Sequence, residues 1–176
     1  MSRAHDPGSE QRGPAIYVDA DACPVKTEVC RVARRYRLHV TLVANARMRV
    51  TDPDVASLVV VAGEFNAADD WIAEQVTTGD IVITADIPLA ARCVRRGARV
   101  LGPTGVELSD ANVGQALATR DLLAELREAG AMLGGPPPFQ PRDRSRFLQG
   151  LDRMIQEVKR NRPDRSLLDN PWGMDR

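Results

Sequence analysis

Short apolar segments alternate with amphipathic segments along the first hundred residues, and this alternation restricts the fold more than any other feature. The predicted strands are residues 15–19, 39–44, 58–61, 80–85 and 99–101. Between them apolar residues recur every three or four positions, as in Val25, Val29 and Val32, which predicts amphipathic helices. Strands that alternate with helices in this way form parallel crossover units. The sequence therefore predicts an α/β fold, a central parallel sheet between two layers of helices.

Acidic residues follow two of these strands. Right-handed crossovers in a doubly wound sheet give the strand order 3-2-1-4-5, and the winding direction then reverses between the first and fourth strands. Ligands of such sheets bind outside the carboxyl ends of the strands at that reversal. Asp19 and Asp21 end the first strand, and Asp86 follows the fourth. We expect these three carboxylates to lie close together.

Converging carboxylates predict a metal site. Without a cation they repel one another and at least one pKa rises, whereas a hard divalent ion with oxygen ligands removes the conflict. We therefore expect Mg²⁺ or Mn²⁺ to bind Asp19, Asp21 and Asp86. Asp69 and Asp70 begin a helix predicted at residues 67–76, and Asp69 is the preferred further ligand.

Each of these acids also has a structural interpretation. Asp69 and Asp70 suit the positive end of a helix dipole, Asp86 suits an N-terminal cap, and Asp21 suits a turn. These separate roles do not explain why the acids at strand ends fall where the topology makes them neighbours. The coincidence favours the metal site.

Other polar residues near the same edge have two interpretations each. Thr84 is expected to bond a ligating carboxylate or a phosphate, or simply to pack within its strand. Arg47 and Arg49 are expected to meet phosphates, or to lie on a solvated loop. Cys23 is close to the acids, but neither histidine is placed to activate it, so a cysteine nucleophile is not expected.

The length of 176 residues and an apolar content of 43% fit one domain. We expect a disordered leader at residues 1–14, the domain at 15–160 and a flexible tail at 161–176. Apolar runs are far shorter than the roughly 20 residues of a membrane span, and the leader lacks a secretory signal. These features predict a cytoplasmic protein with reduced thiols that binds no membrane. The formal net charge of +0 offers no general attraction to nucleic acid.

Beyond residue 105 the pattern becomes entirely helical, with predicted helices at residues 110–129 and 142–160. The second helix has an apolar stripe of Phe147, Leu151, Met154, Ile155 and Val158. A stripe of this kind requires an apolar partner, either the sheet or a second subunit, so homo-oligomerisation through these C-terminal helices stays open.

Several motifs occur together in one order. They are Asp19-Ala20-Asp21-Ala22-Cys23-Pro24, Val43-Ala44-Asn45, Ala68-Asp69-Asp70, Thr84-Ala85-Asp86-Ile87-Pro88, Arg120-Asp121-Leu122-Leu123, Gly134-Gly135-Pro136 and Arg142-Asp143-Arg144. The chain thereby resembles the YaiI/YqxD family, uncharacterised bacterial proteins with a PIN-like domain, from about residue 16 to residue 159. The resemblance implies a PIN-like parallel sheet and, where catalytic, acids that bind Mg²⁺ or Mn²⁺ and hydrolyse RNA. The corresponding acids here are Asp19, Asp21, Asp69 and Asp86. An acid is common in the family where this chain has Asn66.

Three functional hypotheses follow. The first is a metal-dependent phosphodiesterase or nuclease acting on RNA or a nucleotide, with Asp19, Asp21 and Asp86 catalytic. Its substrate-binding residues would be Thr84, Asn45, Arg47, Arg49 and Arg120. The second is a haloacid-dehalogenase-like phosphatase, which the absence of a lysine between Lys26 and Lys159 disfavours. The third is a non-catalytic module that binds RNA or a protein and uses the acids structurally.

Overall fold

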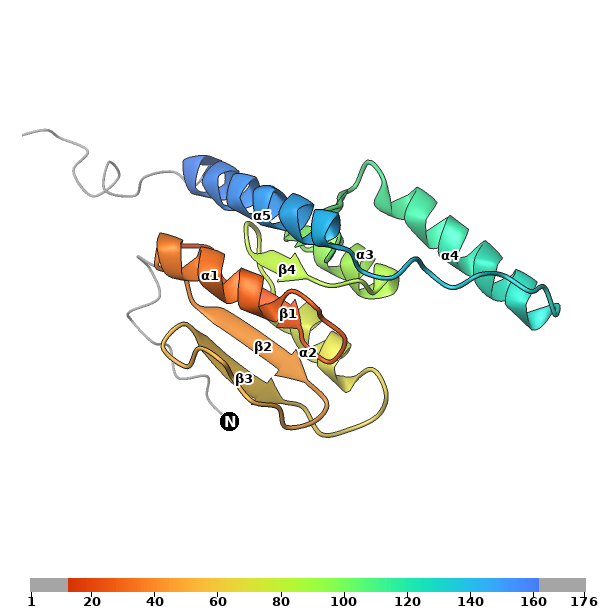
Figure 1. Cartoon of the computed structure of the whole chain (residues 1–176), viewed down its shortest axis with the longest axis horizontal. Helices are drawn as coiled ribbons and strands as arrows, with labels where there is room; N and C mark the ends of the chain where they lie inside the picture. The colour runs from red at the N-terminus through yellow and green to blue at the C-terminus, as the bar shows by residue number, and fades with distance from the viewer. Residues whose placement is uncertain (1–12, 162–176) are drawn as a thin grey trace, which may run out of the picture.

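The computed structural model describes residues 13–161, and within them one six-stranded sheet has the order β3-β2-β1-β4-β5-β6 (Figure 1). The predicted order of the first five strands is confirmed. The elements in chain order are β1 (Ile16–Asp19), α1 (Lys26–Tyr36), β2 (Val40–Ala44), β3 (Ala56–Val60), α2 (Ala67–Gln75), β4 (Ile81–Ile83), α3 (Ile87–Arg95), β5 (Arg99–Leu101), β6 (Glu107–Leu108), α4 (Val113–Glu128) and α5 (Pro141–Asn161).

The first five strands run parallel, and β1 lies between β2 and β4. The carboxyl ends of these five strands therefore lie at one edge of the sheet. The sixth strand was not predicted, because β6 has only two residues and shows no alternation. It pairs with β5 in the antiparallel direction, with Val100 opposite Leu108.

Successive side chains of each strand face opposite layers, which divides the core in two. Ile81 and Ile83 of β4 belong to one cluster with residues of α1 and α5, whereas Val82 packs with α2 and α3. Figure 1 shows the same division, with α1 and α5 over one face of the sheet. The predicted three-layer α/β architecture is confirmed.

The apolar stripe of α5 is buried within its own chain: Phe147, Leu151 and Ile155 are 0% exposed. Of the two partners expected for this stripe, the sheet and a second subunit, it is the sheet that packs against it. Helix α4 differs, since it buries none of its residues and extends away from the sheet (Figure 1). Oligomerisation through the C-terminal helices stays a prediction.

Some boundaries differ from those predicted. The fourth strand ends at Ile83 rather than at residue 85, and Thr84, the next residue, bonds through its side chain to Asp19 of β1. Helix α4 begins at Val113 rather than at residue 110, because Asn112 forms a turn by accepting a hydrogen bond from the Ser109 N–H. The predicted leader and tail lie outside the described residues, apart from residues 13, 14 and 161. No helix within residues 13–161 is long and apolar enough to cross a membrane.

The turn between β5 and β6 requires a glycine. Gly105 has φ +86°, and a Cβ there would lie 2.7 Å from the Arg146 carbonyl carbon. We predict that Gly105→Ala lowers the free energy of unfolding by about 2 kcal/mol or more, through an unfavourable backbone conformation and overlap with α5. Urea denaturation followed by circular dichroism measures this loss.

Gly114→Ala is the matched control, because a Cβ there meets nothing within 4 Å and the residue lies in α4. Helix propensity predicts no loss, or a gain of up to about 1 kcal/mol. Equal losses in both variants would contradict the packing that we assign to Gly105.

Candidate functional site

The ends of β1 and β4 are joined by one hydroxyl group. Thr84, which directly follows β4 and is 1% exposed, donates a hydrogen bond of 2.9 Å from Oγ1 to Asp19 Oδ2. The same Oγ1 accepts a hydrogen bond of 3.0 Å from the Asp86 N–H. Thr84 therefore bonds one of the predicted carboxylates and holds the backbone of another.

Asp86 caps α3. Its Oδ1 accepts a hydrogen bond of 2.8 Å from the Leu89 N–H, and Pro88 lies in the first turn, where a missing N–H carries no cost. The structural role predicted for Asp86 is therefore confirmed. The cap occupies one carboxylate oxygen and places the Asp86 side chain at the carboxyl edge of the sheet, beside Asp19.

Asp21 is held by the loop after β2. Its Oδ2 accepts hydrogen bonds from the Asn45 N–H at 2.9 Å and from Asn45 Nδ2 at 2.8 Å. Lys26, which sequence reasoning did not assign to the site, donates from Nζ to the Ala20 carbonyl oxygen at 2.9 Å. Both contacts position the segment between Asp19 and Asp21. Lys26 could have been suspected from the sequence, because it closely follows this segment and is one of only two lysines in the chain.

The two acids of α2 face different surroundings. Asp70 is exposed and forms an ion pair of 2.7 Å with Arg92. Asp69 is half-buried, and its pKa is raised to about 6, first by burial and then by the carboxylates of Asp86 and Asp19. These influences indicate that Asp69, rather than Asp70, faces the other acids.

We call Asp19, Asp69 and Asp86 the carboxylate cluster, with Asp21 beside it. Burial raises the pKa of Asp19, the hydrogen bond from Thr84 lowers it, and the charges of Asp86 and Asp21 raise it further. Within the described part of the chain, no three carboxylate, histidine or cysteine side chains form a preassembled metal site. The acids are nevertheless near enough to influence one another's pKa values.

The predicted phosphate-binding arginines lie on separate elements. Arg47 and Arg49 are exposed on the loop after β2, and neither has an ion-pair partner within residues 13–161. Arg120, on α4, forms an exposed ion pair of 3.1 Å with Asp121. It also lines a groove of about 480 Å³ that includes Ile87, the first residue of α3.

The contacts of the cysteines do not support a cysteine nucleophile at this edge of the sheet. Cys23, Cys30 and Cys93 are free and buried, and burial raises the pKa of each thiol. His39 lies at the start of β2 on the opposite edge, where its Nε2 is 2.8 Å from Ser57 Oγ. Among the described residues, the carboxylates are therefore the ionisable groups that gather where a ligand would bind.

The chemistry of this donor set suits a hard divalent cation. Carboxylate oxygens are the ligands that Mg²⁺ and Mn²⁺ prefer, and such a charge would offset the repulsion that adds to burial in raising the pKa values of Asp19 and Asp69. Without a cation, protonation of Asp69 relieves part of that repulsion.

The pKa of Asp69 predicts a pH-dependent stability. A carboxyl whose pKa is about 6 in the folded protein and 3.8 otherwise binds protons more tightly when folded. The contribution of Asp69 to the free energy of unfolding therefore falls as pH rises from about 4 to 6, and above that window it is unfavourable. We predict that Asp69→Asn raises the urea midpoint at pH 7 and leaves it unchanged at pH 4.

Asp70→Asn is the matched control, since it removes an exposed ion pair worth about 1 kcal/mol at most and relieves only the smallest of the repulsions that raise the pKa of Asp69. It should not raise the midpoint at pH 7. A midpoint for Asp69→Asn that follows wild type at both pH values would contradict the electrostatic coupling within the cluster.

Comparisons with known proteins place the chain among bacterial relatives. A UPF0178 protein of Azorhizobium caulinodans is 54% identical over 145 residues, which are 82% of this chain and 91% of that protein. A UPF0178 protein of Rhodospirillum rubrum is 55% identical over 149 residues, 84% of this chain and 99% of that protein. A UPF0178 protein of Agrobacterium fabrum is 56% identical over 150 residues, which are 85% of this chain and 97% of that protein. No solved structure matches the chain at a significant level.

The family model described as "Uncharacterized BCR, YaiI/YqxD family" matches residues 17–157. This span runs from β1 to the last turns of α5 and includes every residue of the carboxylate cluster. The chain belongs to the YaiI/YqxD family.

Proposed function

We propose that this protein is a divalent-metal-dependent phosphodiesterase that acts on RNA or a nucleotide. One observation carries the proposal: Asp19 of β1, Asp69 of α2 and Asp86 at the start of α3 influence one another at the carboxyl edge of the sheet, where burial and then the charges of Asp86 and Asp19 raise the pKa of Asp69 to about 6. Perturbed carboxylates at the reversal point of a doubly wound sheet are typical of a functional site. The PIN-like character that the family resemblance implies points to the same chemistry.

Asp19, Asp69 and Asp86 would hold the ion, and Asp21 stands beside them as a further ligand. Bound Mg²⁺ or Mn²⁺ supplies Lewis acidity toward a phosphate and a charge that favours deprotonation of the attacking water. Thr84 fixes Asp19 by its hydrogen bond, and Asn45 fixes Asp21. Because the acids form no preassembled site within residues 13–161, binding requires the carboxylates to turn toward one another.

The substrate phosphates would meet arginines around this edge. Arg47 and Arg49 are exposed on the loop after β2 and have no ion pair within residues 13–161, and Arg120 lines the groove beside Ile87. A planar guanidinium group suits the bidentate recognition of phosphate. A cytoplasmic location fits RNA or a nucleotide as substrate.

A non-catalytic binding module is the second candidate, and one observation favours it. Asp86 already caps α3 and Asp21 is already bonded to Asn45, so both acids have structural work without a metal. A haloacid-dehalogenase-like phosphatase is less well supported. That class requires a lysine after the threonine, whereas Lys26 binds the Ala20 carbonyl and the next lysine is Lys159.

Metal binding separates these candidates without a guess about substrate. We predict that the metal-stripped protein binds Mn²⁺ in isothermal titration calorimetry and that Asp19→Asn and Asp86→Asn each lose at least tenfold in affinity. Asp54→Asn is the matched control, because Asp54 is exposed and precedes β3 at the opposite edge of the sheet. If the wild-type protein binds no Mn²⁺, the non-catalytic binding module becomes the better-supported function.

Thr84 is predicted to act through Asp19. Thr84→Val removes the hydroxyl that bonds Asp19 and accepts from Asp86, so we expect a tenfold or greater loss of Mn²⁺ affinity, since groups that orient ligands typically contribute this much. Thr84→Ser retains the hydroxyl and should retain the affinity. Folding of both variants is verified by urea denaturation. If Val and Ser behave alike, the hydrogen bond does not position the metal ligand.

A further inference from the structure

The first turns of α5 carry three arginines, and only one has a partner. Arg144 Nε forms an ion pair of 2.9 Å with Glu28, whose side chain is 7% exposed, and its guanidinium group lies 5.7 Å from the centre of the Phe139 ring. Arg142 and Arg146 form no ion pair or side-chain hydrogen bond with any residue in the range 13–161. Two guanidinium groups are thus left without a counter-charge from the described chain.

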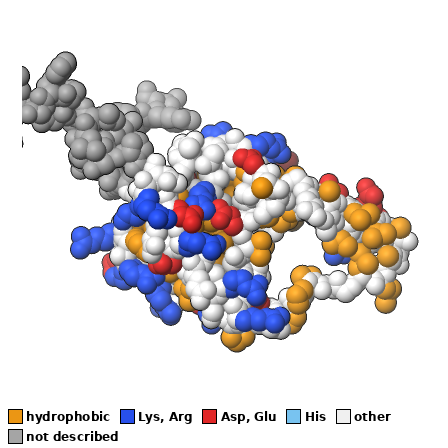
Figure 2. All heavy atoms as spheres, turned by 90° about the horizontal axis from the view of Figure 1, so that it is seen from above, with side chains coloured by type: hydrophobic (Ala, Val, Ile, Leu, Met, Phe, Trp, Pro, Cys, Tyr) orange, Lys and Arg blue, Asp and Glu red, His pale blue; other side chains and the backbone are white. Residues whose placement is uncertain are grey.

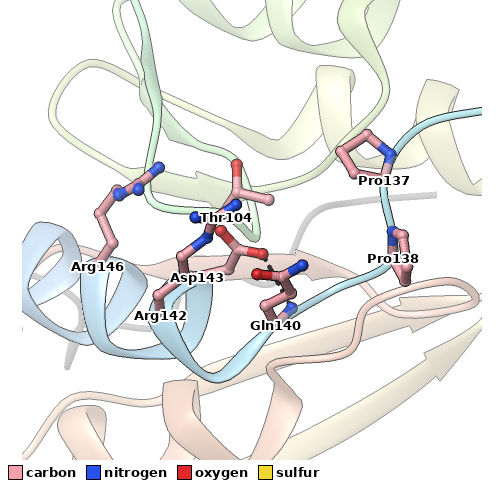
Figure 3. Close-up of a pocket in the computed structure, with 7 residues that line it drawn as sticks. All are labelled: Thr104, Pro137, Pro138, Gln140, Arg142, Asp143 and Arg146. Atoms are coloured by element: carbon pink, nitrogen blue, oxygen red, sulfur yellow. Dashed lines mark hydrogen bonds between the residues drawn. The ribbon is translucent and has the colours of Figure 1, made fainter.

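These two arginines line a pocket of about 260 Å³ (Figure 3). Figure 3 shows both side chains extending from α5 toward the loop that carries Thr104. The full lining is Thr104, Pro137, Pro138, Gln140, Arg142, Asp143 and Arg146. The volume is several times the ~30 Å³ that one water molecule occupies in the liquid, so the pocket has room for a polyatomic group.

Backbone contacts hold the two walls of the pocket together. The Gly105 N–H donates to the Gly102 carbonyl at 2.9 Å, which closes the turn that presents Thr104. A Cβ at Gly105 would lie 2.8 Å from the Phe147 nitrogen, so this turn is packed directly against α5. The hydroxyl of Thr104 and the side chain of Arg146 are therefore carried by rigidly joined elements.

The pocket lies at the same sheet edge as the carboxylate cluster. Arg144 pairs with Glu28 in the first turn of α1, and Asp152 pairs with Arg35 in its last turn, so α5 runs parallel to α1. The start of α5 is therefore on the side where α1 begins, which is the carboxyl side of β1. Thr104 follows β5, which is adjacent to β4.

The cluster is consequently flanked by unpaired arginines on both sides. Arg47 and Arg49 follow β2, on one side of β1, while Arg142 and Arg146 lie near the end of β5, on the far side of β4. Three strand steps separate β2 from β5, which is roughly 14 Å at the usual spacing of strands. A chain of phosphates laid along this edge would meet cations at both ends and the carboxylates between them.

We propose that this pocket is a phosphate subsite that binds the backbone of single-stranded RNA beside the scissile phosphodiester, an inference that rests on the proposed function. The guanidinium groups of Arg142 and Arg146 donate to the phosphate oxygens, and the Thr104 hydroxyl adds a neutral donor. Asp143 also lines the pocket, and its Oδ2 accepts from the Gln140 N–H at 2.9 Å. Pro141 has no N–H, and the N–H groups of Asp143 and Arg144 donate to the Gln140 carbonyl, so we assign the attraction to the side chains.

The test uses full-length protein, EDTA and a short fluorescent single-stranded RNA, so that binding is measured without cleavage. Arg142→Gln/Arg146→Gln should weaken RNA binding roughly tenfold at low salt and reduce the slope of log affinity against log salt by about 1.4, the value for two lost phosphate contacts. Arg160→Gln is the matched control, because it removes one unpaired arginine at the other end of α5. It should change the affinity less than twofold.

An RNA affinity equal to wild type in the double variant, or no RNA binding by wild type, overturns the proposal. Inorganic phosphate is the second probe: if the double variant loses phosphate but keeps RNA, the pocket holds a small phosphate compound and the assignment to RNA is wrong. Mn²⁺ calorimetry on the same double variant reports separately on the carboxylate cluster. Absence of Mn²⁺ binding in both the double variant and wild type would count against the proposed function. It would not by itself count against phosphate binding in this pocket.

Discussion

The hydroxyl of Thr84 is the contact on which the arrangement of the site depends. It is 1% exposed, and it is fully engaged because it donates to Asp19 and accepts from the Asp86 N–H. A buried hydroxyl without partners would cost about 1–3 kcal/mol, so the sheet edge is built around this pair of bonds. The same residue follows β4 and joins Asp19, the last residue of β1, to the backbone of Asp86, the N-cap of α3.

Opposite charges are distributed unevenly around this edge. Some arginines elsewhere are neutralised, as Arg34 is by Asp52, whereas others, such as Arg160, have no ion pair within residues 13–161. At the carboxyl edge the acids lie together in the middle, while Arg142 and Arg146 on one side have no acidic partner in the described chain. A formal net charge of +0 conceals this pattern, because it averages paired and unpaired groups. Figure 2, the view onto α5, shows basic side chains interspersed with acids on that face and apolar side chains over α4.

Much of the fold was predictable because it depends on local patterns. Apolar runs and three- to four-residue periodicity locate the main strands and helices, and the crossover rule orders the first five strands. The preference for Asp69 over Asp70 as a metal ligand stays a prediction, although Asp70 pairs with Arg92 and Asp69 is half-buried. Strand β6 was missed because two residues carry no periodicity. It exists because β5 offers an edge and the Gly105 turn reverses the chain.

The sequence by itself determined the α/β class, the strand order and the meeting of Asp19 with Asp86, because parallel crossovers bring the carboxyl ends of β1 and β4 to one edge. Tertiary structure decided which polar groups remain free. That Arg144 is bound by Glu28 while Arg142 and Arg146 are not, and that α5 covers the sheet, depend on contacts between residues far apart in the chain. Such contacts follow from the packing of whole elements, which no local pattern of residues records.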